Sequence, residues 1–218
     1  FPDENINSFI ENSREKAIFA SERFPHNHFA ISEDSGIVVP SIGAEARVSS
    51  SPLYGMNSVL FPGVVSARFG HIDTLTPLLS NLQNGKQVLA DCVATDETST
   101  EINNVTLYEL VTRHSESVMT GERKPMAIIN TFASVAKNGE LIAEGHGSLV
   151  GEISANENVV NRDAAMFDGH GYNPIFFVPT YNDFLSDISL ARRVNFDHRS
   201  QAFVASITSM LLSLKVKK

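Results

Sequence analysis

The middle of the chain contains two runs rich in apolar residues on either side of an Asn-Gly pair. The runs are residues 127–136 and 141–153, and residues 137–140 between them read Lys-Asn-Gly-Glu. Asn138 and Gly139 readily take the positive φ angles that a two-residue type I′ turn requires. The sequence therefore predicts a long β-hairpin, and any fold for this chain must contain a sheet built on it.

We expect one helix before this hairpin in the chain and one after it. Ser8 and Glu11 have the spacing of a capping box, which predicts a helix over about residues 9–23. Asp197 can cap a second helix near the other end of the chain. The buried stripe predicted for that second helix consists of Phe203, Ile207, Met210, Leu211 and Leu214. Strands and helices together predict an α/β fold.

Shorter elements are predicted around the hairpin. Residues 28–33 are expected to form a strand that ends at a turn, Asp34-Ser35-Gly36. Residues 175–178 are a continuous apolar run, which predicts a strand covered on both faces. Residues 44–60 and 71–102 have irregular sequence, and we interpret them as two insertions in a single domain.

Composition excludes several classes of protein. The 218 residues, 42% apolar and 19% charged, suit one globular domain, and no apolar run approaches the roughly 20 residues that span a bilayer. A net charge of -8 argues against nucleic-acid binding, because phosphate contacts need clustered Lys and Arg. Cys92 is the only cysteine, so no internal disulfide forms, and we expect a reducing, cytoplasmic location.

Candidate phosphate and metal ligands lie in the first part of the chain. Glu33 and Asp34 are adjacent acids, costly to bury without a cation, and carboxylates are the hard oxygen ligands that Mg²⁺ prefers. Asn12 and Lys16 are four residues apart, hence on one face of the first helix, where Lys can act as a point charge for phosphate. A solvated turn and an ordinary surface Lys are the alternative readings.

Candidate base-binding residues lie in the last part of the chain. The block 169–174 reads Gly-His-Gly-Tyr-Asn-Pro, in which glycines let the backbone approach a ligand and His170 and Tyr172 offer flat faces. His198 and Arg199 open the last helix, where they can hydrogen-bond a nucleotide. A Gly-rich turn and a capped surface helix remain the alternatives. No G-x-x-x-x-G-K-[ST] motif occurs, so the chain is not a P-loop nucleotidase.

Five sequence blocks, in one order, resemble the inosine triphosphate pyrophosphatase-like family. Residues 8–17, S-F-I-E-N-S-R-E-K-A, are similar to T-F-x-E-N-A-x-x-K-A, and residues 32–37, S-E-D-S-G-I, to A-D-D-S-G-L. Residues 62–69, P-G-V-V-S-A-R-F, resemble P-G-x-x-S-A-R-Y. Residues 169–179, G-H-G-Y-N-P-I-F-F-V-P, resemble G-F-G-Y-D-P-I-F-F-V-P, and residues 196–202, F-D-H-R-S-Q-A, resemble x-S-H-R-x-x-A.

The resemblance implies both a fold and an activity. The fold is an α/β structure with an elongated mixed β-sheet, flanking helices and two lobes with a central cleft. The activity is that of a nucleoside-triphosphate diphosphatase, a Mg²⁺-dependent hydrolase that converts noncanonical purine nucleoside triphosphates to monophosphate and pyrophosphate. Family members are usually homodimers, so the resemblance also implies a homodimer here.

The resemblance assigns roles residue by residue. Asp34 would be a metal ligand and the general base, Glu4 or Asp3 a second metal ligand, and Lys16 the residue that holds phosphate. The substrate-binding set would be Asn12, Lys16, Ser35, Gly36, His170, Gly171, Tyr172, Asn173, Arg193, His198 and Arg199.

The chain departs from the family pattern at several positions. Family members begin with a strand and a T-G-N-x-x-K loop. Either this segment is encoded upstream of Phe1, which the non-Met start favours, or this protein does without it. His170 stands where the family has Phe and Asn173 where it has Asp, and these two changes leave the base preference open. These departures leave two alternatives open: a nucleotide-binding or regulatory module with impaired catalysis, and a structural domain that keeps the fold as a scaffold.

Overall fold

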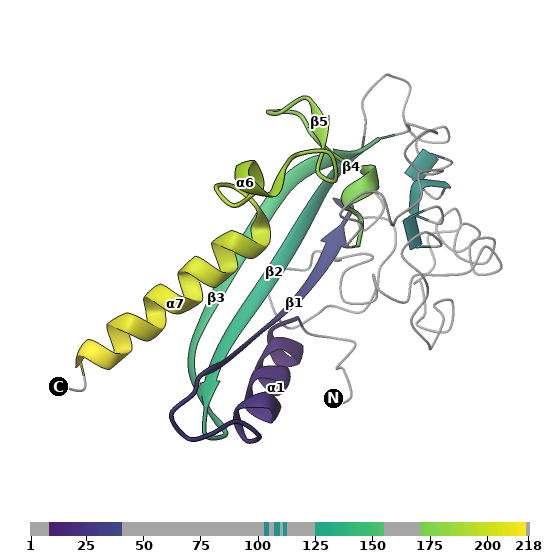
Figure 1. The fold of residues 1–218 in the computed structure, drawn as a ribbon. Coiled ribbons are helices and arrows are strands. Elements are labelled where there is room, and N and C mark those ends of the chain that lie inside the picture. Colours follow the sequence, from purple (N-terminus) through teal and green to yellow (C-terminus); the bar gives the residue numbers. More distant parts are fainter. Residues whose placement is uncertain are drawn as a thin grey trace, which may run out of the picture. The chain divides into compact units, whose positions relative to one another are not determined.

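The computed structural model describes residues 9–40, 103–104, 107–109, 111–112, 125–154 and 171–216. The elements are α1 (Phe9–Ser21), β1 (Ala30–Val38), β2 (Met126–Lys137), β3 (Glu140–Ile153), the 3₁₀ helix η4 (Asn173–Ile175), β4 (Phe176–Val178), β5 (Asp183–Phe184), α6 (Leu190–Arg193) and α7 (His198–Val216) (Figure 1). The chain divides into two compact units, one made of Phe1–Ser35, Ile129–Leu149 and Leu190–Lys218, the other of Gly36–Ile128 and Val150–Ser189. Among the described residues, no helix is long and apolar enough to cross a membrane.

The strands form one antiparallel sheet in the order β1-β2-β3-β4-β5. In the second unit, Ile153 of β3 is opposite Phe176 of β4, and Val178 of β4 is opposite Asp183 of β5. The predicted α/β class, with helices flanking a sheet, is confirmed. The described strands contribute antiparallel pairing, whereas the resemblance implied a mixed sheet.

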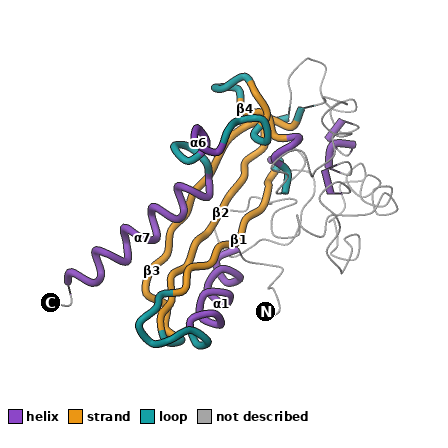
Figure 2. The backbone as a smooth tube through the Cα atoms, in the orientation of Figure 1, coloured by secondary structure: helices purple, strands orange, loops and turns teal. Residues whose placement is uncertain are grey.

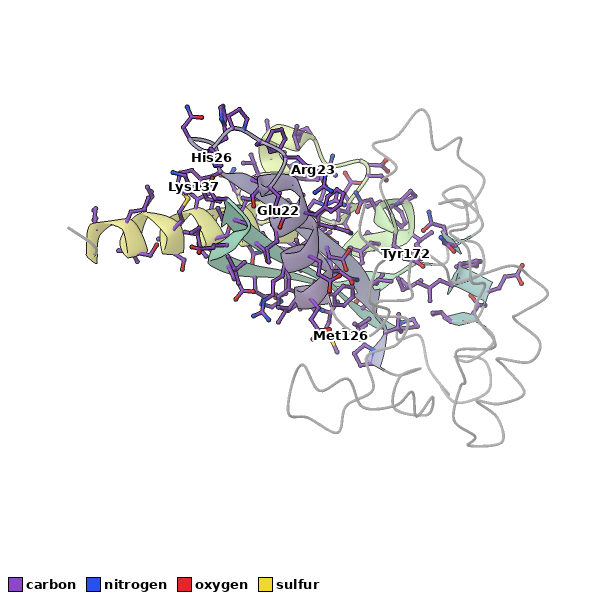
Figure 3. The ribbon with its side chains drawn as sticks, turned by 90° about the horizontal axis from the view of Figure 1, so that it is seen from below. Glu22, Arg23, His26, Met126, Lys137 and Tyr172 are labelled. Carbon is purple, nitrogen blue, oxygen red and sulfur yellow. The ribbon has the colours of Figure 1, made fainter. Side chains whose placement is uncertain are left out.

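The predicted hairpin is confirmed, and its turn has the expected geometry. Strands β2 and β3 run without interruption on either side of it (Figure 2). Asn138 has φ 52° and Gly139 φ 80°, the positive pair of a type I′ turn. The Gly139 N–H donates to Ser21 Oγ at 2.9 Å, and His26 Nδ1 lies 3.1 Å from Asn138 Oδ1. The end of α1 is thereby fastened to the hairpin turn, where His26 and Lys137 lie close together (Figure 3).

The first unit has two distinct sheet faces, because successive side chains of a strand point to opposite sides. On one face lies α1: Phe9 stacks on Phe132, and Ser13 Oγ lies 2.8 Å from Ser134 Oγ. On the other face lies α7, whose His198 Nδ1 lies 2.6 Å from Thr131 Oγ1. Phe132 and Ser134 of β2 thus contact α1, and Thr131, on the opposite face, contacts α7.

Two glycines of β3 let α7 lie directly on the strand. A Cβ atom on Gly145 would fall 2.2 Å from the Ala202 carbonyl oxygen, and one on Gly147 would fall 2.0 Å from the His198 carbonyl oxygen. Small side chains therefore make the contact, and Ala202 and Ser206 are fully buried.

The stripe predicted for the last helix is wrong, because Ala202 and Ser206 occupy the buried side. Of the predicted residues, Ile207, Leu211 and Leu214 are exposed and only Phe203 and Met210 are half-buried. The Asp197 cap is confirmed, since its Oδ1 accepts the Arg199 N–H at 3.1 Å.

Two further predictions need correction. Asp34, Ser35 and Gly36 do not form a turn: they lie inside β1, where the sheet supplies hydrogen-bonding partners that local sequence does not reveal. The apolar run at 175–178 begins with Ile175 in η4, because Pro174 favours a helical start, and only Phe176–Val178 is extended. Phe177 is half-buried rather than covered. Ser8 and both proposed insertions, residues 44–60 and 71–102, lie outside the described residues.

Candidate active site

On the α1 face, Asp34 is held between two donors from one helix. Asn12 Nδ2 donates to Asp34 Oδ2 at 2.8 Å, and Lys16 Nζ lies 3.0 Å from Asp34 Oδ1. The helical spacing of Asn12 and Lys16 places both above the same point of β1. The side chains of Lys16 and Asp34 are 18% and 15% exposed, so the charged pair is partly accessible to water.

On the α7 face, hydroxyl groups join β1 and β2 to the start of α7. The Ser35 hydroxyl donates to Glu33 and also lies 2.7 Å from Thr131 Oγ1. Thr131 Oγ1 lies 2.6 Å from His198 Nδ1, and Thr131 and His198 are both buried. We call Glu33, Ser35, Thr131 and His198 the hydroxyl chain.

Charged side chains surround His198, at one end of the hydroxyl chain. Arg199 Nε lies 3.2 Å from Glu33 Oε1 as an ion pair without the alignment of a hydrogen bond, and His198 Nε2 lies 3.3 Å from Asp197 Oδ1. Burial lowers the pKa of His198 to about 4, although Asp197 and Glu33 oppose the shift. The imidazole is therefore neutral at pH 7.

The Asp34 contacts on the α1 face and the hydroxyl chain on the α7 face start from adjacent residues of β1. Asp34 and Ser35 are neighbours in the strand, and alternation sends them to the α1 face and the α7 face, respectively. A partly exposed carboxylate with a Lys and a buried neutral imidazole are thus fixed at the same level of one strand.

Comparison with known proteins identifies the group to which this architecture belongs. The family model described as the Ham1 family matches residues 1–208. The chain belongs to the Ham1 family. It is 27% identical over 201 residues to a dITP/XTP pyrophosphatase of Acidobacterium capsulatum, covering 92% of this chain and 75% of that protein. It is 24% identical over 202 residues to a dihydroneopterin triphosphate diphosphatase of Limosilactobacillus reuteri, covering 93% and 74%.

Solved structures agree in fold. A HAM1 protein from Coxiella burnetii matches with a TM-score of 0.60 and 18% identity, over 97% of this chain and 81% of that one. The Ham1 protein of Staphylococcus aureus matches with a TM-score of 0.54 and 20% identity, over 100% and 82%. These likenesses support the Ham1 fold.

The other predicted site residues of this Ham1 chain lie elsewhere in the described structure or outside it. Gly36 is buried inside β1, and Arg193 is buried at the end of α6. In the second unit, the Gly171 carbonyl accepts a hydrogen bond from Asn104 Nδ2 at 3.2 Å, while Tyr172 and Asn173 are buried around η4. Burial also raises the pKa of the Tyr172 phenol. Asp3, Glu4 and His170 lie outside the described residues.

Sequence reasoning missed Thr131 and gave Glu33 no role of its own. Thr131 follows Asn130 in the middle of β2, and its partner Ser35 is 96 positions away. Its signal was a hydroxyl side chain within a strand of mostly apolar residues, on the face opposite to that of Ser134. Glu33 and Asp34 are adjacent acids, and the sequence does not show that they point to opposite faces of the sheet.

The oxygen atoms on the α1 face fit a hard cation. Asn12 Oδ1 is buried and has no hydrogen-bond partner among the described residues, and it belongs to the same group as the two carboxylate oxygens of Asp34. Amide and carboxylate oxygens are the donors that Mg²⁺ takes, usually with substrate phosphates completing its shell. Within the described ranges, no three His, Cys, Asp or Glu side chains gather closely enough to hold a metal alone.

Proposed function

We propose that this chain is a nucleoside triphosphate pyrophosphatase that hydrolyses noncanonical purine nucleoside triphosphates to monophosphate and pyrophosphate with Mg²⁺. Family membership and relatives named as triphosphate pyrophosphatases support the reaction class. The observation that carries the proposal is the position of the Asp34 carboxylate, between the Asn12 amide and the Lys16 ammonium group.

The reaction breaks the bond between the α-phosphorus or β-phosphorus atom and the oxygen that bridges them. The oxygen of a water molecule bonds to the attacked phosphorus, and the bridging oxygen leaves with the electron pair. In the proposed mechanism Asp34 accepts the proton that the water loses. Lys16 exchanges its contact with Asp34 for the phosphate oxygens, which a flexible point charge on a partly exposed side chain can do. Positioning and electrostatics supply most of the rate.

Mg²⁺ would be held by Asp34 and Asn12 Oδ1, with Glu4 or Asp3 as the further carboxylate ligand that we propose from outside the described residues. When bound, it offsets the negative charge on the phosphate oxygens. The unpartnered Asn12 oxygen is consistent with a group that meets its partner only when the site is loaded.

The base would be bound from the start of α7. His198 and Arg199 present a neutral ring and a guanidinium group there, with Arg193 nearby in the same unit. Arg199 Nε is buried, and its 3.2 Å contact with Glu33 Oε1 lacks the alignment of a hydrogen bond, so this group can still donate to a ligand. The block 170–173 stays proposed as a further part of the base site.

Two finer expectations accompany this proposal: a homodimer and a cytoplasmic location. Light scattering of the purified chain tests the first, where a monomer at micromolar concentration would contradict it. Fractionation of the source cells tests the second.

Initial rates of pyrophosphate release test the proposed function. ITP, XTP, dUTP, ATP and GTP are supplied in turn with Mg²⁺, and each assay is repeated with excess chelator. We expect Mg²⁺-dependent release that is fastest with ITP or XTP. Turnover of none of the five would end the proposal. Binding without turnover would instead identify a nucleotide-binding module, and neither binding nor turnover a scaffold domain.

A further inference from the structure

The hydroxyl chain on the α7 face has a direction. Glu33 pairs with Arg199 and is therefore an acceptor-only carboxylate, so its contact with Ser35 uses the single hydrogen of the Ser35 hydroxyl. Thr131 must then donate to Ser35 Oγ, 2.7 Å away. This leaves Thr131 Oγ1 as the acceptor for His198 Nδ1 at 2.6 Å. The hydrogens run from His198 to Glu33, and Nδ1 carries one of them.

The other ring nitrogen has no comparable partner among the described residues. His198 Nε2 lies 3.3 Å from Asp197 Oδ1, longer than a charge-assisted hydrogen bond and without the alignment of one. The charged groups that act on the ring are Asp197, Arg199, Arg193 and Glu33. Burial outweighs the two carboxylates, so the ring is neutral at pH 7 and only one nitrogen carries hydrogen.

We infer that Thr131 is a positioning residue for base recognition: it relays hydrogen-bond direction from Glu33 through Ser35, so that His198 carries its hydrogen on Nδ1 and offers Nε2 as an acceptor. The inference rests on the role proposed above for His198 in binding the base. The ligand group that suits an acceptor at Nε2 is a ring N–H. Purines with a 6-oxo group carry N–H at position 1, whereas adenine carries an unprotonated nitrogen there. Thr131 would thus contribute to selection between these two classes without touching the substrate.

The tautomer of His198 is the direct test, and it requires no substrate. Two-bond ¹H–¹⁵N spectra of the full chain, labelled at histidine, identify which ring nitrogen is protonated, and a His198→Gln variant assigns the signal. We expect Nδ1–H in the wild type at pH 7. Thr131→Val keeps the side-chain shape but removes the acceptor, so we expect Nε2–H to become populated. Thr131→Ser restores the acceptor and should restore Nδ1–H.

Selectivity is the second test. The ratio of kcat/KM for ITP over ATP should fall roughly tenfold in Thr131→Val, the effect of one lost net hydrogen bond, and recover in Thr131→Ser. Ser134→Ala is the matched control, because Ser134 is a buried hydroxyl of the same strand that faces α1 and contacts Ser13. Its loss should leave both the ratio and the His198 tautomer unchanged.

The outcomes separate this inference from the proposed function. A wild-type Nε2–H tautomer, or a Thr131→Val variant that keeps both tautomer and selectivity, would overturn the role of Thr131. A wild type that releases no pyrophosphate would contradict the proposed function alone. In that case the ratio of the Kd values for ITP and ATP measures selectivity, and the spectra still decide the tautomer of His198.

Discussion

The two faces of the same three strands hold polar groups in opposite ways. On the α1 face, Lys16 and Asp34 are charged and partly exposed, and water can take over their contacts when they separate. On the α7 face, Thr131 and His198 are buried, so their hydrogen bonds must be made with protein or ligand groups rather than with bulk water. The comparison indicates that the α1 face can exchange partners during a reaction, whereas the α7 face keeps one arrangement.

Loss of the Asp34 charge should produce the largest effect, and we expect it to change rate more than stability. In Asp34→Asn we expect pyrophosphate release to fall by roughly 10²–10³, the effect of one lost electrostatic contact in a transition state. The free energy of unfolding should fall by less than the activation free energy rises, by roughly 1–3 kcal/mol, because the ion pair with Lys16 is more than four-fifths buried. Steady-state kinetics and urea unfolding measure the two. Glu144→Gln, another α1-face carboxylate, is the control. Equal losses of rate in the two variants would remove the distinction between them.

Burial of His198 should make stability depend on pH. Its pKa is about 4 when folded and 6.5 when exposed, so between these values the unfolded chain binds more protons. The contribution of neutral His198 is therefore fully present above pH 6.5 and is lost as pH falls to about 4. It amounts to about 3 kcal/mol, from 1.36 kcal/mol for each unit of pKa. Urea unfolding at several pH values gives the free energy of unfolding as a function of pH. Between pH 4 and 6.5 this free energy should rise less steeply with pH in His198→Gln than in the wild type. A His198→Gln variant with the same pH dependence of stability as the wild type would contradict a buried neutral imidazole at position 198.

The close approach of α7 to β3 should make Gly147 intolerant of a side chain. Gly147→Ala places a Cβ atom 2.0 Å from the His198 carbonyl oxygen, so the start of α7 must shift. We expect a loss of roughly 1–3 kcal/mol in the free energy of unfolding, together with weaker nucleotide binding. Val150→Ala, at an exposed position of the same strand, is the control and should be nearly neutral. A Gly147→Ala variant with wild-type stability would show that the helix does not lie on the strand.

An exposed ion pair on the α1 face should have the smallest effect. Arg14 contacts both carboxylate oxygens of Glu144, at 2.6 and 2.9 Å, and this hydrogen bonding raises the pKa of Arg14. Both side chains are more than a third exposed, so the pair should contribute no more than about 1 kcal/mol. A double-mutant cycle with Arg14→Met and Glu144→Gln measures the coupling. A coupling well above that value would mean that this face is less accessible to water than we infer.

Local signals predicted the elements of the fold whose ends are set by neighbouring residues. The Asn138-Gly139 turn requires positive φ angles that few residues take, and Asp197 caps the helix that follows it. The error at Asp34-Ser35-Gly36 has a different origin. Turn-forming composition is a local property, but Ser35 is held by Thr131, 96 positions away.

The buried side of α7 could not be read from α7 alone. An apolar stripe indicates the buried side when large side chains fill the space between a helix and a sheet. Here Gly145 and Gly147 remove that space, so Ala202 and Ser206 make the contact and larger residues remain exposed. The candidate site, too, was predictable in part. Helical spacing placed Asn12 and Lys16 together, but the sequence did not show that Asp34 and His198 belong to opposite faces.

The central claim is that the Asp34 carboxylate directs water to the linkage between the α-phosphate and the β-phosphate. Phosphorus NMR of the products formed from ITP and Mg²⁺, with wild type and Asp34→Asn side by side, tests it most directly. We predict inosine monophosphate and pyrophosphate in equal amounts from the wild type, and formation at least about 10²-fold slower from the variant. Inosine diphosphate with inorganic phosphate, or equal rates from both proteins, would contradict the account.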